Sequence, residues 1–387
     1  MPPETGATGQ ADTTEVAAWL RLLRTPGVGP STYNAILAAF DSPAHFFDAD
    51  AASIRAAALD PDLRASAPDR EDADIAADLA WLTAPDHHLI TRHDPHYPEQ
   101  LAAIADPPPL LFVAGAAALL QRPQLAIVGS RKATRGGLDN AREFARHLAG
   151  NGLAITSGLA LGIDGAAHRG ALSAPGATVA VTATGPDRIY PAHHRDLARE
   201  IAGGGAIVTE FPTGVRVRRE QFPRRNRVIS GLALGVLVVE AGVRSGSLLT
   251  ARHALEQGRE VFAIPGSIHN PLARGCHALI RQGAKLVESA ADVFDELPPL
   301  PIAEAPADTR PTAAGAEDAT AGAGDAEPAL NDDYQALLEA LGHDPVSFDV
   351  LAERAGLTAD TLSSMLLILE LKGYVTASPG GRYARLR

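Results

Sequence analysis

The chain of 387 residues is longer than an average domain, so we expect two or three modules that each bury a hydrophobic core. Its one cysteine, Cys276, excludes an intrachain disulfide and a cysteine-based metal cage and is typical of a reducing compartment, which predicts a cytoplasmic protein. The net charge of −12 would argue against a nucleic-acid partner, but residues 121–297 hold 22 Lys and Arg against 15 Asp and Glu, and the segments on both sides are acidic.

Residues 1–12 are polar, lack the basic and apolar regions of a signal peptide, and are predicted to be a disordered tail. Residues 13–85 have the apolar spacing of an N-terminal helical domain. Two of its helices flank a Gly-Val-Gly turn at 27–29, which resembles a helix-hairpin-helix, a module whose backbone N–H groups can contact a DNA phosphate. A tight helical corner without DNA contact has about the same sequence, and the acidity of the surrounding residues favours that interpretation.

Residues 86–297 alternate between apolar and helical segments. The apolar segments are short, as buried parallel strands are, and this pattern predicts repeated βαβ units in an α/β fold with an extended Rossmann-like parallel sheet. A short apolar lead-in precedes that sheet. No apolar run is long enough to cross a bilayer, so we expect no membrane segment. The strand candidates are residues 125–128, 154–156, 178–182, 206–209, 236–239 and 261–264.

The last part of the chain changes character twice. Residues 298–330 are rich in Ala, Pro, Gly and acidic residues and predict a disordered acidic linker. Residues 331–387 predict three helices and a hairpin, which is the order of a winged-helix domain. The third helix, 358–371, has only Lys372 as a basic residue at its end, so protein contact is favoured over DNA reading.

The first loop of the sheet follows residue 128 and holds Gly129, Ser130, Arg131 and Lys132. Such loops lie at the carboxyl edge of a parallel sheet, where ligands bind. The glycine spacing of a dinucleotide fold and the Walker A pattern are both missing, which argues against NAD and against a P-loop nucleotide. We interpret this small-residue loop as an anion site, with a plain surface turn as the alternative.

Two further loops carry candidate groups. Residues 156–165 form a glycine-rich turn before a helix, on which Asp164 and His168 are four apart. We interpret Asp164 as a cap and His168 as a packed or paired residue, since no second carboxylate completes a catalytic or metal site. Residues 245–247, Ser-Gly-Ser, open another helix and predict a second anion-binding turn.

The segment 211–227 is the densest basic stretch, with six arginines and the aromatic residues Phe211 and Phe222. Arginines neutralise phosphates, and a phenylalanine ring can stack on a base, at about 1 to 3 kcal/mol per base. A solvated helix face with ion pairs is the alternative, but only Glu210 and Glu220 lie nearby in the sequence.

Six segments in order closely resemble the DNA-processing protein A family (DprA, also called Smf). The resemblance implies a bacterial cytoplasmic protein that binds and protects incoming single-stranded DNA in natural transformation, loads the RecA recombinase and acts as a homodimer. It also implies a helix-hairpin-helix or SAM-like N-terminal domain, a winged-helix C-terminal domain and a dimer contact near residues 275–284. The segments are residues 126–131, 157–168, 209–212, 222–231, 245–251 and 263–266.

By motif, the resemblance assigns a set of DNA-binding residues to the loops of the sheet. No catalytic residue, metal or cofactor is implied, and the protein is not expected to be an enzyme. An alternative is a nucleotide-processing enzyme similar to the phosphoribohydrolases, with Glu240 as its acid, although the Gly-Gly-x-Gly-Thr loop of those enzymes is missing here. The DNA-binding set is Gly129, Ser130, Arg131, Ser157, Gly158, Phe222, Arg225, Asn226, Arg227, Ser245, Gly246 and Ser247.

Overall fold

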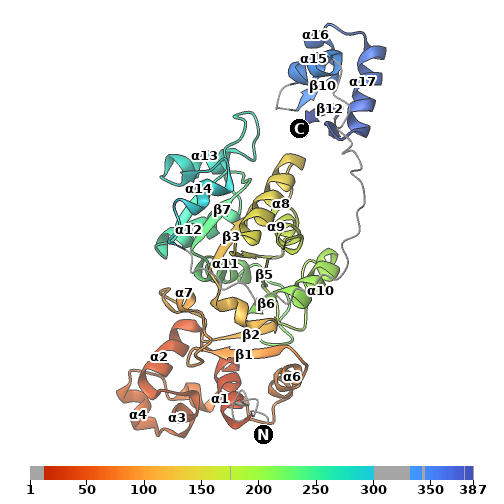
Figure 1. Ribbon diagram of the computed structural model, residues 1–387. Coiled ribbons are helices and arrows are strands. Elements are labelled where there is room, and N and C mark those ends of the chain that lie inside the picture. Colours follow the sequence, from red (N-terminus) through yellow and green to blue (C-terminus); the bar gives the residue numbers. More distant parts are fainter. Residues whose placement is uncertain (1–12, 175, 300–331, 342–344, 379, 387) are drawn as a thin grey trace, which may run out of the picture. The chain divides into compact units, whose positions relative to one another are not determined.

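The computed structural model describes residues 13–174, 176–299, 332–341, 345–378 and 380–386, which fall into two compact units divided after residue 302 (Figure 1). We refer to them as the N-terminal unit and the C-terminal unit. The predicted tail 1–12, and the predicted linker except for Pro298 and Pro299, lie outside the described residues. No helix within the described ranges combines the length and apolar character needed to cross a membrane.

Short helices form the first part of the N-terminal unit, and their core is aromatic. The rings of Trp19 and Tyr33 stack with centroids 5.7 Å apart, and the Tyr33 hydroxyl donates a hydrogen bond to the Trp19 carbonyl. Leu110 and Phe112 from the sheet are buried in the same core, so the helices pack directly on the edge of the sheet. The helices are α1 (Thr13–Arg24), α2 (Pro30–Phe40), α3 (Pro43–Asp48), α4 (Ala51–Ala56), α5 (Asp62–Ala65) and α6 (Ala73–Leu82).

The sheet of this unit has nine strands in the order β1-β2-β6-β5-β4-β3-β7-β8-β9. All six predicted strands are confirmed, and they pair in parallel from β6 to β8. The lead-in differs from a purely parallel sheet, because β1 and β2 form an antiparallel pair and β2 joins β6 antiparallel. The strands are β1 (His87–Thr91), β2 (Leu110–Gly115), β3 (Gln124–Val128), β4 (Ala154–Ser157), β5 (Thr178–Val181), β6 (Ala206–Thr209), β7 (Gly235–Val238), β8 (Glu260–Ala263) and β9 (Lys285–Leu286).

Helices cover both faces of the sheet, so the parallel strands are buried on both sides. Along β3, Leu125 and Ile127 face a core with α8 and α9, and Ala126 and Val128 face a core with α11 and α12. This is the alternation of successive strand residues. The helices are α7 (Glu99–Ala102), α8 (Arg135–Gly150), α9 (Ile163–Leu172), α10 (Arg195–Gly204), α11 (Gln221–Leu232), α12 (Ser247–Glu256), α13 (Arg274–Arg281) and α14 (Ala290–Phe294), with short 3₁₀ turns at Ala117–Gln121 and Ala192–His194.

Strand β3 is the point where the strand order reverses. The chain continues from β3 to β4 on one side, whereas β7 lies on the other side of β3. The loops that leave β3 and β7 therefore run to opposite faces of the sheet, and a crevice opens between them, where ligands bind in folds of this kind.

The C-terminal unit has the predicted winged-helix order, with three helices and a three-stranded sheet. Its core includes Leu351, Leu362 and Leu369. Helix α17 leaves Leu367 and Leu371 exposed, so its outer face is mainly apolar and not basic. The elements are α15 (Asp332–Leu341), β10 (Val346–Ser347), α16 (Phe348–Ala355), α17 (Ala359–Leu371), β11 (Val375–Ser378) and β12 (Arg382–Arg385).

Candidate nucleic-acid interface

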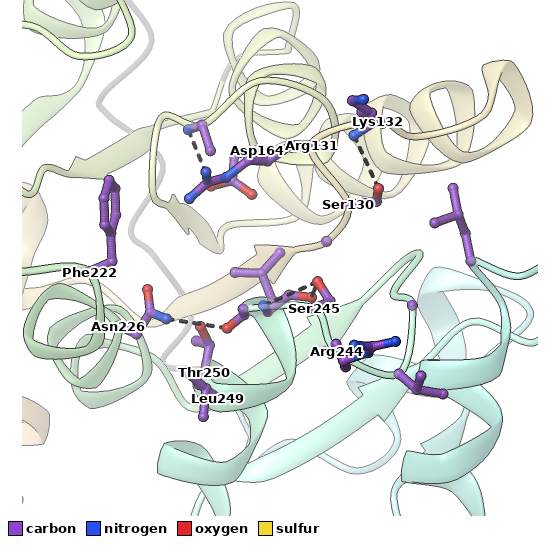
Figure 2. Close-up of a pocket in the computed structure, with 18 of the residues that line it drawn as sticks. Ser130, Arg131, Lys132, Asp164, Phe222, Asn226, Arg244, Ser245, Leu249 and Thr250 are labelled. Atoms are coloured by element: carbon purple, nitrogen blue, oxygen red, sulfur yellow. Dashed lines mark hydrogen bonds between the residues drawn. The ribbon is translucent and has the colours of Figure 1, made fainter. Parts of the chain in front are cut away.

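A cavity of about 870 Å³ lies at the crevice beside β3 (Figure 2). It is lined by the loop after β3, the loop after β7, the beginning of α12 and one face of α11. Nine of the twelve predicted DNA-binding residues line it, and they come from three separate segments of the chain: Gly129, Ser130, Arg131, Phe222, Arg225, Asn226, Ser245, Gly246 and Ser247.

The loop after β3 is held by its backbone, and its charged side chains are left exposed. The Ser130 N–H donates to the Glu240 carbonyl at 2.7 Å, and the Lys132 N–H donates to the Ser130 hydroxyl at 3.1 Å. A Cβ on Gly129 would lie 2.6 Å from the Ile163 side chain, so only glycine fits there. Arg131 and Lys132 are exposed at the rim of the cavity and can meet an anion without breaking these bonds.

Glu240 fixes the end of this loop. Its Oε2 accepts the Thr134 N–H at 2.8 Å, and its Oε1 accepts the Thr134 hydroxyl at 2.7 Å. Thr134 is the N-cap of α8, and Asn270 also donates to the carboxylate at 3.3 Å. Both carboxylate oxygens are therefore engaged in positioning the loop. The nucleotide-processing alternative needs this carboxylate as a free catalytic acid.

Ser157 and Gly158, both predicted DNA-binding residues, lie beneath the cavity and do not line it. The Ser157 hydroxyl is fully buried and donates to the Ile127 carbonyl at 2.6 Å, because β4 ends next to β3. A Cβ on Gly158 would lie 1.2 Å from Nη1 of Arg225. Gly158 therefore affects the cavity indirectly, because the missing side chain leaves room for the guanidinium of Arg225.

Arg225 is the buried basic group of the cavity, with only 6% of its surface exposed. Its Nη1 lies 4.0 Å from Oδ2 of Asp164, and its Nε has no hydrogen-bond partner among the described residues. Burial lowers the pKa of Arg225, partly offset by Asp164. A buried guanidinium with an unused donor is costly unless an anion completes it.

Asp164 does not cap its own helix, contrary to the prediction from the sequence: the N-cap of α9 is Gly162, without a side-chain hydrogen bond, and Asp164 binds the preceding loop instead. Its Oδ2 accepts the N–H groups of Gly158 at 3.2 Å and Ala160 at 3.3 Å. Burial raises the pKa of Asp164, and Arg225 acts in the opposite direction. Asp164 therefore holds the glycine-rich turn in place and lies close to Arg225.

Arg227, the other arginine of the predicted pair, points away from the cavity. Its Nη2 lies 2.6 Å from Oε2 of Glu210, and its Nη1 donates to the Asp106 carbonyl at 2.7 Å. Two residues along a helix of 3.6 residues per turn are about 200° apart around the axis, so Arg225 and Arg227 cannot share a face. Arg227 is thus engaged in a buried ion pair outside the cavity, and its predicted DNA contact stays a prediction.

Phe222 and Asn226 contribute an aromatic face and a brace. The Arg131 guanidinium carbon lies 5.2 Å from the Phe222 ring centroid, and the ring is half-buried. Asn226 donates from Nδ2 to the Gly246 carbonyl at 3.3 Å, which ties α11 to the beginning of α12. Ser245 and Ser247 share a hydrogen bond of 2.7 Å beside that helix end, where the helix dipole favours an anion.

The charge of the cavity is strongly positive. Six basic side chains line it, against the single acid Asp164. Three of the six, Arg219, Arg244 and Arg274, were not named as candidates from the sequence. Arg219 lies in the basic segment and Arg244 precedes the Ser-Gly-Ser turn, so charge near a motif was a usable signal for both. Arg274 begins α13, and no local pattern marks it.

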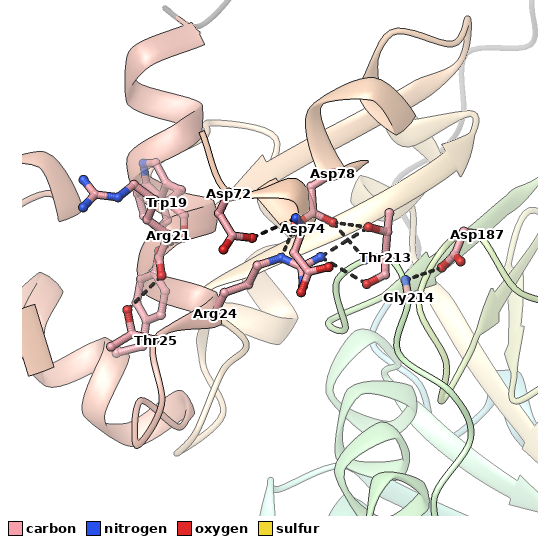
Figure 3. A network of polar contacts seen from close by, with 11 residues as sticks. Trp19, Arg21, Arg24, Thr25, Asp72, Asp74, Asp78, Asp187, Thr213 and Gly214 are labelled. Atoms are coloured by element: carbon pink, nitrogen blue, oxygen red, sulfur yellow. Dashed lines mark hydrogen bonds and ion pairs between the residues drawn. The ribbon is translucent and has the colours of Figure 1, made fainter. Parts of the chain in front are cut away.

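A buried polar network fixes the basic segment that leads to Phe222 (Figure 3). Asp78 in α6 is fully buried, and its Oδ1 accepts the Thr213 N–H at 2.9 Å and the Thr213 hydroxyl at 2.7 Å. Its Oδ2 pairs with Nε of Arg24 at 2.6 Å. Arg24 also donates to the Thr213 carbonyl at 3.1 Å. The N-terminal helices therefore hold one end of the segment that reaches the cavity.

His168 is a buried structural residue. Its Nδ1 lies 2.7 Å from the Thr178 hydroxyl, which itself donates to the Ile155 carbonyl. The hydroxyl hydrogen is thus used, so Nδ1 carries the proton and Nε2 is left with no partner among the described residues. Burial lowers the pKa of His168 to about 3, with smaller contributions from His194, Arg169 and Arg225.

Comparison with known proteins decides the family. The sequence model described as DNA recombination-mediator protein A matches residues 88–298, which is more than half of the chain. The chain belongs to the DprA family. Models for a DprA-like N-terminal helix-hairpin-helix domain and a DprA winged-helix domain match residues 13–70 and 321–381. Both ends of the chain therefore match DprA modules as well.

DprA relatives cover most of the chain. Protein Smf of Escherichia coli (strain K12) is 46% identical over 318 residues, 81% of each chain. The crystal structure of DprA from Streptococcus pneumoniae has a TM-score of 0.64 and 35% identity, covering 73% of this chain and 98% of that one. A Helicobacter pylori DprA structure, described for its single-stranded DNA binding mode, has a TM-score of 0.50 and 28% identity over 54% of this chain and 94% of that one.

Proposed function

We propose that this DprA-family chain binds single-stranded DNA in the cavity beside β3. The observation that carries the proposal is Arg225, a buried guanidinium with an unused Nε donor in a cavity with six basic side chains and one acid. A DNA phosphate can neutralise the basic groups of the cavity, and Phe222 offers a base a stacking face. The Helicobacter pylori relative, which is described as binding single-stranded DNA, supports the same ligand.

The cavity favours a single strand over a duplex for a physical reason. Its anion donors lie on separate loops around a recess, and its aromatic ring is only half-buried. A flexible strand can turn its phosphates to these donors and expose a base to the ring, whereas the bases of a duplex are stacked on one another. We therefore expect binding that depends strongly on salt and weakly on sequence.

The test is a titration of the full chain into a labelled single strand of about sixteen nucleotides, at about 50 mM and about 200 mM salt. Binding that weakens steeply with salt, and exceeds that of a duplex of the same length, supports the proposal. Arg131→Ala removes an exposed donor and should weaken binding by about tenfold. Arg55→Ala removes an exposed arginine of α4 and serves as the matched control. Absence of salt-dependent binding contradicts the proposal.

We further infer, from the family resemblance, that the bound strand is incoming DNA in natural transformation, that it is protected, and that the protein loads RecA onto it as a homodimer. In a nuclease assay, the wild-type chain should protect a single strand, and Arg131→Ala should protect it less. RecA filament growth on DNA already covered by a single-strand-binding protein should start faster when the chain is added. Unchanged filament growth contradicts the loading role.

The homodimer is proposed to form through residues 275–284, which include most of α13. The buried side of that helix, with Cys276 and Leu279, is used by its own core. Ala278 and Arg281 lie on its accessible side. Sedimentation of the wild-type chain should show a dimer, and Ala278→Glu should shift it to a monomer. A wild-type chain that stays monomeric contradicts this part.

A further inference from the structure

A second basic cavity, of about 820 Å³, lies on the α10 side of the sheet. It is lined by the loop after β5, by α10 and by the middle of the basic segment. Four arginines line it, against one acid, Asp187. The first cavity does not share these residues. The arginines are Arg188, Arg195, Arg199 and Arg216.

Two of the four arginines are already paired, and two are not. Arg188 lies 3.1 Å from Asp187, and Arg199 lies 2.6 Å from Asp196. Within the described part of the chain, no carboxylate is within ion-pair distance of Arg195 or Arg216, and both are exposed. The cavity therefore presents two uncompensated positive charges, which an anion of the right spacing can neutralise.

An aromatic pair joins this cavity to the first one. Tyr190 lines the second cavity and is 46% exposed, and Phe222 lines the first. Their ring centroids are 6.2 Å apart, with an angle of 58° between the planes. Arg216 and Arg219 come from the same basic segment and line the second and the first cavity respectively. A chain with aromatic bases and regular phosphates could therefore leave the first cavity over these rings.

The two loops that carry Tyr190 and Arg216 are bound to each other. Oδ1 of Asp187 accepts the Gly214 N–H at 2.9 Å, which fastens the loop after β5 to the basic segment. The preceding residue, Thr213, is held by Asp78 and Arg24. Arg216 and Tyr190 therefore belong to two loops that are bound to each other.

We propose that the second cavity binds the phosphates of the same single strand as the first, with Arg195 and Arg216 as phosphate contacts and Tyr190 as a stacking surface. This inference rests on the proposed single-stranded DNA binding. An acidic peptide would also neutralise arginines, but it has no use for the aromatic pair that connects the two cavities, whereas each base of a strand has a face that stacks.

The experiment compares two lengths of single strand. An oligonucleotide of about four nucleotides fills one site, and one of about sixteen can occupy both. The variant Arg195→Ala/Arg216→Ala should bind the long strand about tenfold more weakly, and its salt slope should be shallower by about 1.4, the value for two lost phosphate contacts. Binding of the short strand should be unchanged. Tyr190→Ala should weaken only long-strand binding, and Tyr190→Phe should restore it.

The control is Arg55→Ala/Arg70→Ala, which removes two exposed arginines from the N-terminal helical part. Its long-strand affinity should match the wild type. The proposal is overturned if Arg195→Ala/Arg216→Ala binds the long strand with the affinity and salt slope of the wild type. It is also overturned if the affinities for the short and the long strand fall by the same factor. If poly-glutamate binds the wild type, binds Arg195→Ala/Arg216→Ala more weakly, and does not displace the long strand, the cavity would instead be assigned to an acidic protein. If the wild type binds neither strand, the proposed function itself fails.

Discussion

Arg225 and Arg227 are two positions apart in α11 and differ in what holds them. Arg225 lines the cavity and has a buried, unpartnered Nε, whereas Arg227 compensates Glu210, whose side chain is 3% exposed. Arg227→Ala should therefore lower the free energy of unfolding by about 3 kcal/mol, because it leaves a buried carboxylate with only the partly exposed Arg224. Urea unfolding followed by tryptophan fluorescence measures it, since Trp19 and Trp81 both lie in the N-terminal unit.

The matched variant for that prediction is Arg131→Ala, which should affect DNA binding and leave stability unchanged. Its single-strand affinity should fall, and its urea midpoint should stay at the wild-type value, because Arg131 is exposed. Arg227→Ala should keep its affinity per folded molecule. Loss of affinity in folded Arg227→Ala would return this arginine to the DNA-binding set.

His168 predicts a loss of stability in mild acid. Its pKa is about 3 in the folded protein and about 6.5 in an unfolded chain, so the unfolded state takes up the proton first as the pH falls. The contribution of neutral His168 to the free energy of unfolding is fully present above the pKa of the unfolded state. It is lost progressively as the pH falls below that pKa. Between about pH 7 and about pH 5 this residue alone should cost about 2 kcal/mol.

The measurement compares urea midpoints of the wild type, His168→Gln and His88→Gln across that pH range. The glutamine at 168 can still donate to Thr178 but does not titrate, so the slope with pH should become flatter. His88 is exposed, and its variant should keep the wild-type slope. Equal slopes for all three proteins would contradict the assignment.

At the scale of elements, Asp78 links α6 to the basic segment before α11. Asp78→Asn keeps the shape but turns an amide group toward a donor, either Arg24 or Thr213, so a buried donor is left without an acceptor. We expect a loss of about 3 kcal/mol in the free energy of unfolding. Hydrogen exchange of the Thr213 amide should become faster, because that N–H loses its carboxylate partner.

Asp74 provides the control, because it pairs with the same arginine at 3.3 Å but is 74% exposed. Asp74→Asn should change the unfolding free energy by less than about 1 kcal/mol and should leave the Thr213 amide protected. If the two variants behave alike, burial of Asp78 is not what holds the segment.

The same scale shows what sequence patterns can predict. Strands β3 to β8 were predictable because a parallel strand covered on both faces must be short and uniformly apolar. The loops after β3 and β7 followed from that, since their motifs begin where the strands end. The direction of Arg227 could not be predicted, because a motif carries residue types and not their directions around a helix; its DNA contact stays a prediction. Arg274 was missed because only the tertiary fold brings α13 to the cavity.

At the scale of the whole molecule, charge is distributed unevenly along the chain, and both segments that flank residues 121–297 are acidic. Residues 303–387 contribute −8 of the net charge of −12, and the basic excess lies in 121–297. A strand that approaches the cavity is thus attracted by nearby arginines, whereas the formal net charge of the whole chain repels it. Repulsion of this kind acts over about 10 Å at about 0.1 M salt and mainly affects the rate of association.

Removal of residues 303–387 changes the formal net charge from −12 to −4. Because net charge affects the encounter with a polyanion, the shortened chain should associate with a single strand severalfold faster at about 50 mM salt, and the two chains should differ little at about 200 mM. Stopped-flow mixing with a labelled strand measures both rates, and the urea midpoint from tryptophan fluorescence verifies that the shortened chain is folded. Dissociation should change little, because the cavity residues all lie before residue 303. Slower association of the shortened chain would show that the C-terminal unit contributes a DNA contact, which the acidic and apolar character of α17 argues against.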